Sequence, residues 1–204
     1  MICLLNHVPH KCYIALSGGP DSMALLDFLS RSAREIVLLH FDHSTDHGQT
    51  ARTFANKQSI KYGYRIEIGK ITRERDANES KEEYWRNERY KFFDKFKDAP
   101  ILTGHNLSDA VEWWIFSSLH GESKLIPYRR INVIRPLLLT PKKELEKWCQ
   151  DHDVDFCIDP GNHDDRYMRT IIRHRILPLA EKVNPGLEKI LKKKLITKHK
   201  ESGK

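Results

Sequence analysis

The 204-residue sequence has no apolar run that approaches the roughly 20 residues needed by a membrane-spanning helix. Its N-terminus also lacks the layout of a secretory signal peptide. We therefore expect a soluble, cytoplasmic protein with no membrane partner. The four cysteines contain no C-x-x-C pair. We expect buried, reduced thiols at Cys12 and Cys149, and no zinc or iron–sulfur centre.

Acidic residues are too few to balance the basic ones. The formal net charge is +7, and residues 187–204 hold seven lysines against two glutamates. This lysine-rich end therefore carries five of the seven excess positive charges. Such a segment is most often a solvated helix and tail. A polyanionic partner such as nucleic acid is the alternative that the charge leaves open.

The stretch YIALSGGPDSMALLDF, residues 13–28, contains the strongest local signal. A short apolar run, Cys12–Leu16, is typical of a buried strand, and the spacing after Ser22 is typical of a helix packed on a sheet. The glycines between them permit a tight turn, and Asp21 or Ser22 is expected to cap the helix. A helix N-terminus after such a turn is an anion site. The loop lacks both the Walker A lysine and the G-x-G-x-x-G spacing.

Strands and helices are predicted to alternate along the first 119 residues, which indicates an α/β fold with a doubly wound, mostly parallel sheet. Ligands of such sheets lie beyond the carboxyl ends of the strands, here Ser17–Gly19, Asp42–His43 and Gly104–His105. A small helical extension follows. We divide the chain into residues 1–125, 126–186 and a basic tail, 187–204. The expected strands are 12–16, 36–43, 65–68, 100–105 and 132–134; the expected helices are 23–30, 49–62, 81–97, 108–119, 141–151 with Thr140 as cap, and 166–175 ended by Pro178.

A second set of polar residues begins at Gly104. On a helical wheel His105, Asp109 and Glu112 fall on one side, opposite the apolar Leu107 and Val111. Ser108 is the expected cap of this helix. Clustered carboxylates suit Mg²⁺ or a cationic amine substrate. A solvent-facing helix start is the plainer alternative, and the position at the same sheet edge as the Gly-rich loop favours a functional site.

Arginines are spaced along two predicted helices. Arg86 and Arg89 lie on one side of the first, and Arg166, Arg169 and Arg173 lie along the second. Guanidinium groups suit phosphates and base edges, although an arginine-rich face is commonly only solvated.

These stretches together resemble the tRNA(Ile)-lysidine synthases, within the N-type PP-loop ATP pyrophosphatases. The resemblance runs from about Tyr13 to Leu191. Besides the Gly-rich loop it includes these motifs: His40-Phe-Asp-His43, Arg86-Asn-Glu-Arg-Tyr90, His105-x-x-x-Asp-x-x-Glu112, Ile134-Arg-Pro-Leu-Leu138, Asp159-x-x-Asn162 and Arg169-x-x-x-Arg173-x-x-Ile-Leu-Pro178. It implies an adenine-nucleotide α-hydrolase-like fold, in a short form without the C-terminal tRNA-binding domains of many relatives.

The resemblance also implies a reaction. ATP adenylates the wobble cytidine in the CAU anticodon of tRNA(Ile) and releases pyrophosphate, and free L-lysine then displaces AMP to give lysidine. The implied roles are as follows: ATP binding by Ser17, Gly18, Gly19, Asp21, Ser22 and Asp42; Mg²⁺ binding by Asp21 and Asp109; catalysis by Asp21, His105, Asp109 and Glu112; substrate binding by Arg86, Arg89, Arg169, Arg173 and Glu112.

The sequence departs from the family pattern at several positions. Asn106 stands for a usual His, Trp113 for Thr, Thr170 for Asn, residues 44–46 for Gly-Leu-Arg, and residues 120–125 for a Gly-rich segment. These positions bear on cytidine and lysine recognition more than on ATP binding. Two alternatives therefore stay open: a PP-loop ligase with another product, such as a thiolase, and a protein that binds ATP or tRNA without forming lysidine. The oligomeric state is open as well, a homodimer included.

Overall fold

A computed structural model describes residues 1–45, 48–157 and 168–202 and contains a six-stranded sheet in the order β3-β2-β1-β4-β6-β5. All neighbouring strands are parallel except β5 and β6. The expected α/β class with a mostly parallel sheet is therefore confirmed. The strands are β1 (Lys11–Ala15), β2 (Glu35–Asp42), β3 (Ile66–Lys70), β4 (Ile101–Leu102), β5 (Arg129–Arg130) and β6 (Val133–Ile134).

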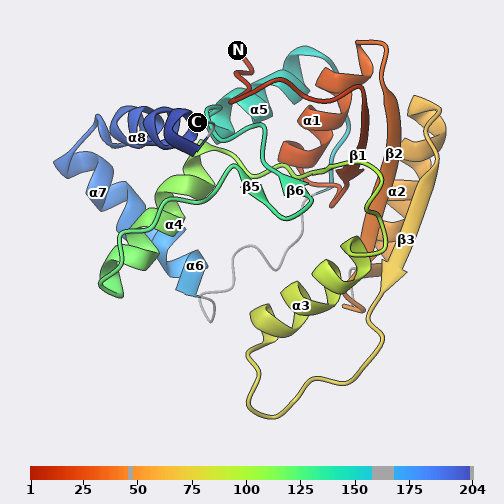
Figure 1. The fold of residues 1–204 in the computed structure, drawn as a ribbon, viewed down its shortest axis with the longest axis horizontal. Coiled ribbons are helices and arrows are strands. Elements are labelled where there is room, and N and C mark those ends of the chain that lie inside the picture. The colour runs from red at the N-terminus through yellow and green to blue at the C-terminus, as the bar shows by residue number, and fades with distance from the viewer. Residues whose placement is uncertain (46–47, 158–167, 203–204) are drawn as a thin grey trace.

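Helices follow most of the strands. They are α1 (Pro20–Ser30), α2 (Gly48–Tyr62), α3 (Lys81–Phe93), α4 (Leu107–Leu119), α5 (Lys142–Asp151), α6 (Met168–Ile171), the π-helical turn η2 (Ile172–Ile176), α7 (Leu177–Val183) and α8 (Leu187–Ser202). In Figure 1, α2 and α3 lie toward β3, whereas α4, α6, α7 and α8 gather beyond the other end of the sheet. None of the described helices is both apolar enough and long enough to cross a bilayer.

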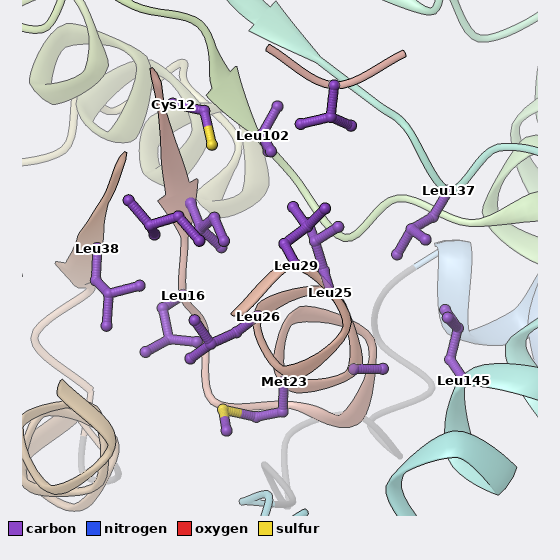
Figure 2. Close-up of a cluster of buried hydrophobic side chains, with 14 of the residues drawn as sticks. Cys12, Leu16, Met23, Leu25, Leu26, Leu29, Leu38, Leu102, Leu137 and Leu145 are labelled. Atoms are coloured by element: carbon purple, nitrogen blue, oxygen red, sulfur yellow. The ribbon is translucent and has the colours of Figure 1, made fainter. Parts of the chain in front are cut away.

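The main core lies between the sheet and α1. Figure 2 shows Met23, Leu25, Leu26 and Leu29 of α1 among apolar side chains of the strands, and all four are at most 1% exposed. This helix is covered on several sides because α5 packs against it as well. Its burial fixes the Gly-rich loop that precedes it.

The expected thiol burial holds for both cysteines. Cys12 and Cys149 are each 1% exposed and carry no disulfide. Burial raises the pKa of each thiol to about 11, so both are protonated at neutral pH.

Two expected helix limits are wrong. The helix predicted for 81–97 ends at Phe93, because the next residues form tight turns that bring Phe96 against Tyr13, with ring centroids 5.1 Å apart. Pro178 does not end a helix. It lies in the first turn of α7, where no backbone donor is needed, and a π-helical turn precedes it.

The expected caps of α1 and α5 are also wrong. Neither Asp21 nor Ser22 caps α1, whose N-cap is Gly19 without a side-chain cap bond. Thr140 does not cap α5, because its hydroxyl exchanges two hydrogen bonds with the backbone of Cys3, and α5 starts one residue later than expected, after Pro141. Some predicted features lie outside the described residues: the turn at 160–162, Asp159, Asn162 and Arg166. The division of the chain into three parts stays a prediction.

Candidate nucleotide site at the edge of the sheet

The Gly-rich loop joins β1 to α1 and is held by its own polar groups. Gly18 has a φ of +90°, a conformation that favours glycine, and its carbonyl accepts a hydrogen bond of 2.8 Å from the Cys157 amide. The Ser22 hydroxyl donates to the Gly19 carbonyl at 3.0 Å and lies 3.1 Å from the Ser17 hydroxyl. Because no side chain caps α1, the first amides of that helix are available to an anion such as phosphate.

Gly104, two residues after the end of β4, lies directly against this loop. A Cβ atom on Gly104 would sit 3.0 Å from the Ser22 amide nitrogen and 3.1 Å from the carbonyl carbon of Asp21. Any larger residue at position 104 would therefore push the loop away. The strand ends at Ser17–Gly19 and Gly104–His105 share one edge of the sheet, as the parallel pairing of β1 with β4 requires.

Asp21 lies in the first turn of α1, near enough to the acidic helix for the charge of Asp109 to act on it. One carboxylate oxygen, Oδ1, is buried and has no hydrogen-bond partner among the described residues. Burial, with a further contribution from the charge of Asp109, raises the pKa of Asp21 to about 7, although Lys142 and Arg173 oppose the rise. A carboxylate that is costly to ionise and lacks a partner is suited to a cation ligand.

The first turn of α4 is fixed by a reciprocal pair of hydrogen bonds. Asn106 Oδ1 accepts from the Asp109 amide at 3.1 Å, and Asp109 Oδ2 accepts from the Asn106 amide at 2.9 Å. Asn106 is thus the cap, and the expectation for Ser108 is wrong, because its hydroxyl instead donates to Glu188 at 3.2 Å. The capping box orients Asp109 and leaves its Oδ1 oxygen directed to the site.

Arg173 joins the two carboxylates of α4. Its Nε and Nη2 atoms donate to the two oxygens of Glu112 at 2.6 and 2.9 Å, and Nη2 lies 3.4 Å from Asp109 Oδ1. Burial raises the pKa of Glu112, which is only 5% exposed, while Arg173 opposes that rise. Burial also disfavours the charge of Arg173, but its hydrogen bonds with Glu112 and the nearby carboxylates raise its pKa overall. The sequence placed Arg173 with the substrate, and the structure pairs it with Glu112 and Asp109.

His105 lies between the carboxylates and a group of arginines. Its Nδ1 atom is 2.8 Å from the Thr103 hydroxyl. Burial is the main cause that lowers the pKa of His105 to about 4; the charge of Asp109 opposes the shift, and the positive charges of Arg135, Arg89 and Arg169 add to it. The imidazole is therefore neutral at pH 7 and can accept a hydrogen bond or a proton.

Beside His105 several arginines surround Tyr90 on α3. Arg86 and Arg130 lie over its ring, at 5.6 and 5.3 Å from the centroid, and Arg135 Nη2 donates to its hydroxyl at 3.2 Å. Burial lowers the pKa of Arg89 and of Arg135, and neighbouring arginines add to the effect. Among the described residues no carboxylate forms an ion pair with these arginines, which makes the region attractive to a phosphate.

Arg135 is a site residue that the sequence analysis did not single out. It is 3% exposed, it donates to the Pro127 carbonyl at 2.8 Å, and its Nε has no partner among the described residues. The signal was present in Ile134-Arg-Pro-Leu-Leu138, where a charge interrupts an apolar run. A buried charge of this kind requires a partner or a ligand.

The structure does not bring every expected residue into direct contact. Asp42 is at the carboxyl end of β2, where its Oδ1 accepts from the Ser44 amide at 2.8 Å. Arg169 lies over the ring of Trp113 at 5.9 Å. The described residues contain no group of three or more His, Cys, Asp or Glu side chains arranged to hold a metal. A cation here would rely on Asp21 and Asp109, with further ligands from phosphate and water.

A parallel sheet with a Gly-rich loop and an uncapped helix start at its carboxyl edge is an architecture typical of α/β nucleotide-binding proteins. The model of the PP-loop domain family matches residues 3–180, and the chain therefore belongs to that family. The NH3-dependent NAD synthetase from Campylobacter jejuni has the same fold, with a TM-score of 0.53 and 14% identity over 98% of this chain and 88% of that one.

Two curated relatives of this chain carry the same name. The chain is 32% identical to the tRNA(Ile)-lysidine synthase of Thermosipho africanus, over 87% of this chain and 45% of the relative. It is 33% identical to that of Clostridium perfringens strain ATCC 13124, over 87% of this chain and 42% of the relative. The chain thus spans less than half the length of these two curated relatives. The expected resemblance is confirmed.

Proposed function

We propose that this protein is a tRNA(Ile)-lysidine synthase, a ligase that uses ATP to adenylate the wobble cytidine of a CAU anticodon and then joins free L-lysine to it. The observation that carries the proposal is the close approach of the Gly-rich loop to the segment that leads from β4 into the acidic helix. A Cβ on Gly104 would crowd the backbone of Asp21 and Ser22, and the charge of Asp109 contributes to the raised pKa of Asp21. A triphosphate on the loop would therefore lie beside the carboxylates. With these substrates, we expect the protein to act in the cytoplasm. That it forms a homodimer stays a prediction.

The loop residues would hold ATP. Ser17, Gly18, Gly19 and Ser22 surround the uncapped start of α1, where amide groups and the helix dipole favour phosphate. Asp42 is a further candidate at the neighbouring strand end. The residues fit Mg²⁺, because Asp21 offers an unpartnered oxygen and Asp109 a second carboxylate. When bound, the ion would neutralise charge on the leaving pyrophosphate.

The cationic side of the site would receive the nucleotide and the cytidine. Arg86, Arg89 and Arg169 have no carboxylate partner among the described residues, and the buried Arg135 lies beside them. These groups can hold phosphate oxygens or the polarised O2 of the base. His105 is neutral, so it can accept a hydrogen bond at this point without adding another positive charge.

Glu112 and Asp109 would bind the ε-ammonium of lysine and accept its proton, which makes the amine a nucleophile. The raised pKa of Glu112 makes it a stronger base than an ordinary carboxylate. In the structure, Arg173 donates hydrogen bonds to both carboxylate oxygens of Glu112. Lysine binding would therefore require Arg173 to turn toward a phosphate, which couples the ammonium site to the loaded nucleotide.

The same ion pair supports the alternative function. A Glu112 that keeps Arg173 has no free oxygen for lysine, and the departures at Asn106 and Trp113 are close to it in sequence. The chain would then bind ATP or tRNA without forming lysidine, or would join another group to the activated base.

An incorporation assay separates these functions. The protein is incubated with ATP, Mg²⁺, radiolabelled lysine and a transcript of tRNA(Ile) with the CAU anticodon. We expect label in the tRNA and one AMP per lysine. A transcript with uridine at the wobble position should stay unlabelled. AMP formation without label would indicate another product, and tRNA binding without AMP would reject catalysis.

A matched pair of variants assigns the carboxylate. Asp109→Asn should abolish incorporation while the protein stays folded. The control, Asp94→Asn, changes an exposed aspartate after α3 and should retain full incorporation. Retained turnover in Asp109→Asn would remove that residue from the catalytic set.

A further inference from the structure

Helix α8 has one apolar and one basic face. Leu187, Leu191 and Leu195 are buried against α4 and its surroundings. Lys189, Lys193, Lys194 and Lys200 are exposed, and none of these four forms an ion pair with a described residue. Like charges at four-residue spacing, as for Lys189 and Lys193, repel one another along a helix, so this basic face lowers the stability of α8.

A groove runs beside the basic face. It has a volume of about 630 Å³ and lies between α8, α4 and the loop that follows α4. The half-exposed indole of Trp114 and the side chain of Leu125 provide an apolar wall. Lysines from α8 provide the opposite rim, together with one carboxylate: Lys193, Lys194, Lys198 and Glu201. An aromatic surface next to cationic side chains is a combination suited to nucleic acid, in which bases stack and phosphates pair with lysine.

The basic face starts at the candidate nucleotide site. Glu188, in the first turn of α8, accepts a hydrogen bond from Ser108, the residue before Asp109. The whole of α8 is 16 residues long, which is a length of about 24 Å at 1.5 Å per residue. The lysines therefore extend from the edge of the carboxylate cluster across the surface.

We propose that the exposed face of α8, represented by Lys189, Lys193 and Lys194, binds the phosphate backbone of the substrate RNA and leads it to the site at Asp109. The inference rests on the proposed function, in which the substrate is a tRNA. The occupant follows from charge complementarity: Leu187–Ser202 holds six lysines against two glutamates. Contacts of this kind position an RNA and read no sequence.

The test compares two triple variants with the same loss of charge. The first is Lys189→Gln, Lys193→Gln and Lys194→Gln. The control is Lys57→Gln, Lys95→Gln and Lys97→Gln, three exposed lysines on and near α2 and α3. Binding of a fluorescently labelled tRNA(Ile) transcript is followed by anisotropy between 50 and 200 mM salt, and ATP binding is measured on the same proteins. Unchanged thermal unfolding shows that both triples are folded.

We expect the tRNA affinity of the α8 triple to be lower by at least about tenfold. The slope of log affinity against log salt concentration should become shallower by about 2 to 3, because each lost phosphate contact removes about 0.9 from it. ATP binding should not change, and the control should behave as the parent chain. Equal tRNA binding by both triples would overturn the inference. So would competition by poly-glutamate as strong as that by RNA, which would indicate an acidic protein partner. A chain that binds RNA through α8 but incorporates no lysine would refute the proposed function and leave this surface in place.

Discussion

Replacing Gly104 with alanine tests the contact on which the site depends. The added Cβ would lie 3.0 Å from the Ser22 amide nitrogen and 3.1 and 3.3 Å from two atoms of Asp21. Two of these neighbours are backbone atoms of the loop, which cannot rotate away as the end of a side chain can. The loop must therefore move by several tenths of an ångström.

The expected cost follows from this crowding. Overpacking of one methyl group against a rigid neighbour destabilises by about 1 to 3 kcal/mol. At about 2 to 4 °C per kcal/mol for a chain of this size, the melting temperature should fall by about 2 to 12 °C. The displaced loop should also bind ATP about tenfold more weakly.

Thermal unfolding and calorimetric ATP titration measure both effects. The control is Gly186→Ala, where the nearest atom to a new Cβ is the side-chain oxygen of Asn184 at 3.2 Å. That side chain can turn aside, so the control should bind ATP as before. If Gly104→Ala keeps both its melting temperature and its ATP affinity, the segment after β4 does not press on the loop and the reasoning fails.

Three further predictions concern the acidic helix and its neighbours. Arg173→Met should lower the free energy of unfolding by about 2 to 3 kcal/mol in urea denaturation, because Glu112 is left buried without a partner; the loss is below that of a fully buried pair because Arg173 is 32% exposed. If adding Glu112→Gln to it restores nothing, the unpaired charge is not the cause. Asn106→Ala should cost about 1 kcal/mol through loss of the capping box, seen as a lower melting temperature, whereas Asn106→Asp should keep the cap. Equal melting temperatures for the two variants would contradict that role. His105 has a pKa of about 4 instead of its usual 6.5, so the unfolded chain binds that proton first and His105 contributes a loss of stability as pH drops from 6.5 toward 4, by up to about 3 kcal/mol. Asp21, whose pKa is raised to about 7, contributes a change of the opposite sign over the same range, because the folded chain binds its proton first. The contribution of His105 is therefore the difference between the parent chain and His105→Gln in urea denaturation across this pH range: the variant should lose less stability, or gain more, toward pH 4, and parallel curves would remove His105 from the acid response.

The sheet edge and its polar residues could be predicted from the sequence. Parallel strands bring their carboxyl ends together, so an apolar run that ends in Ser17-Gly-Gly and another that ends in Gly104-His are expected to meet. Periodicity correctly predicted that Leu107 and Val111 are buried, but it did not predict that Glu112, assigned to the polar side with His105 and Asp109, is buried as well.

The pairing within the site could not be predicted. Arg173 is 61 residues from Glu112 in the chain, and only the packing of η2 near α4 decides which carboxylate its guanidinium meets. Helical spacing showed which side of a helix Arg173 occupies, but not what faces that side.

The caps were predicted incorrectly for a related reason. Ser108 and Thr140 are good capping residues by type, but each hydroxyl has a tertiary partner, Glu188 and Cys3 respectively. Asn106 takes the cap of α4 because Asp109 three residues later can return the bond. A residue type predicts that a cap is available, and the tertiary contacts decide which residue provides it.

The most direct test of the central claim is a crystal structure of the chain with Mn²⁺ and an ATP analogue that carries a methylene group between its α- and β-phosphates. We predict triphosphate density against Ser17–Ser22 and an anomalous Mn²⁺ peak at the carboxylates of Asp21 and Asp109. A nucleotide bound elsewhere, or a metal held away from both aspartates, would contradict the account.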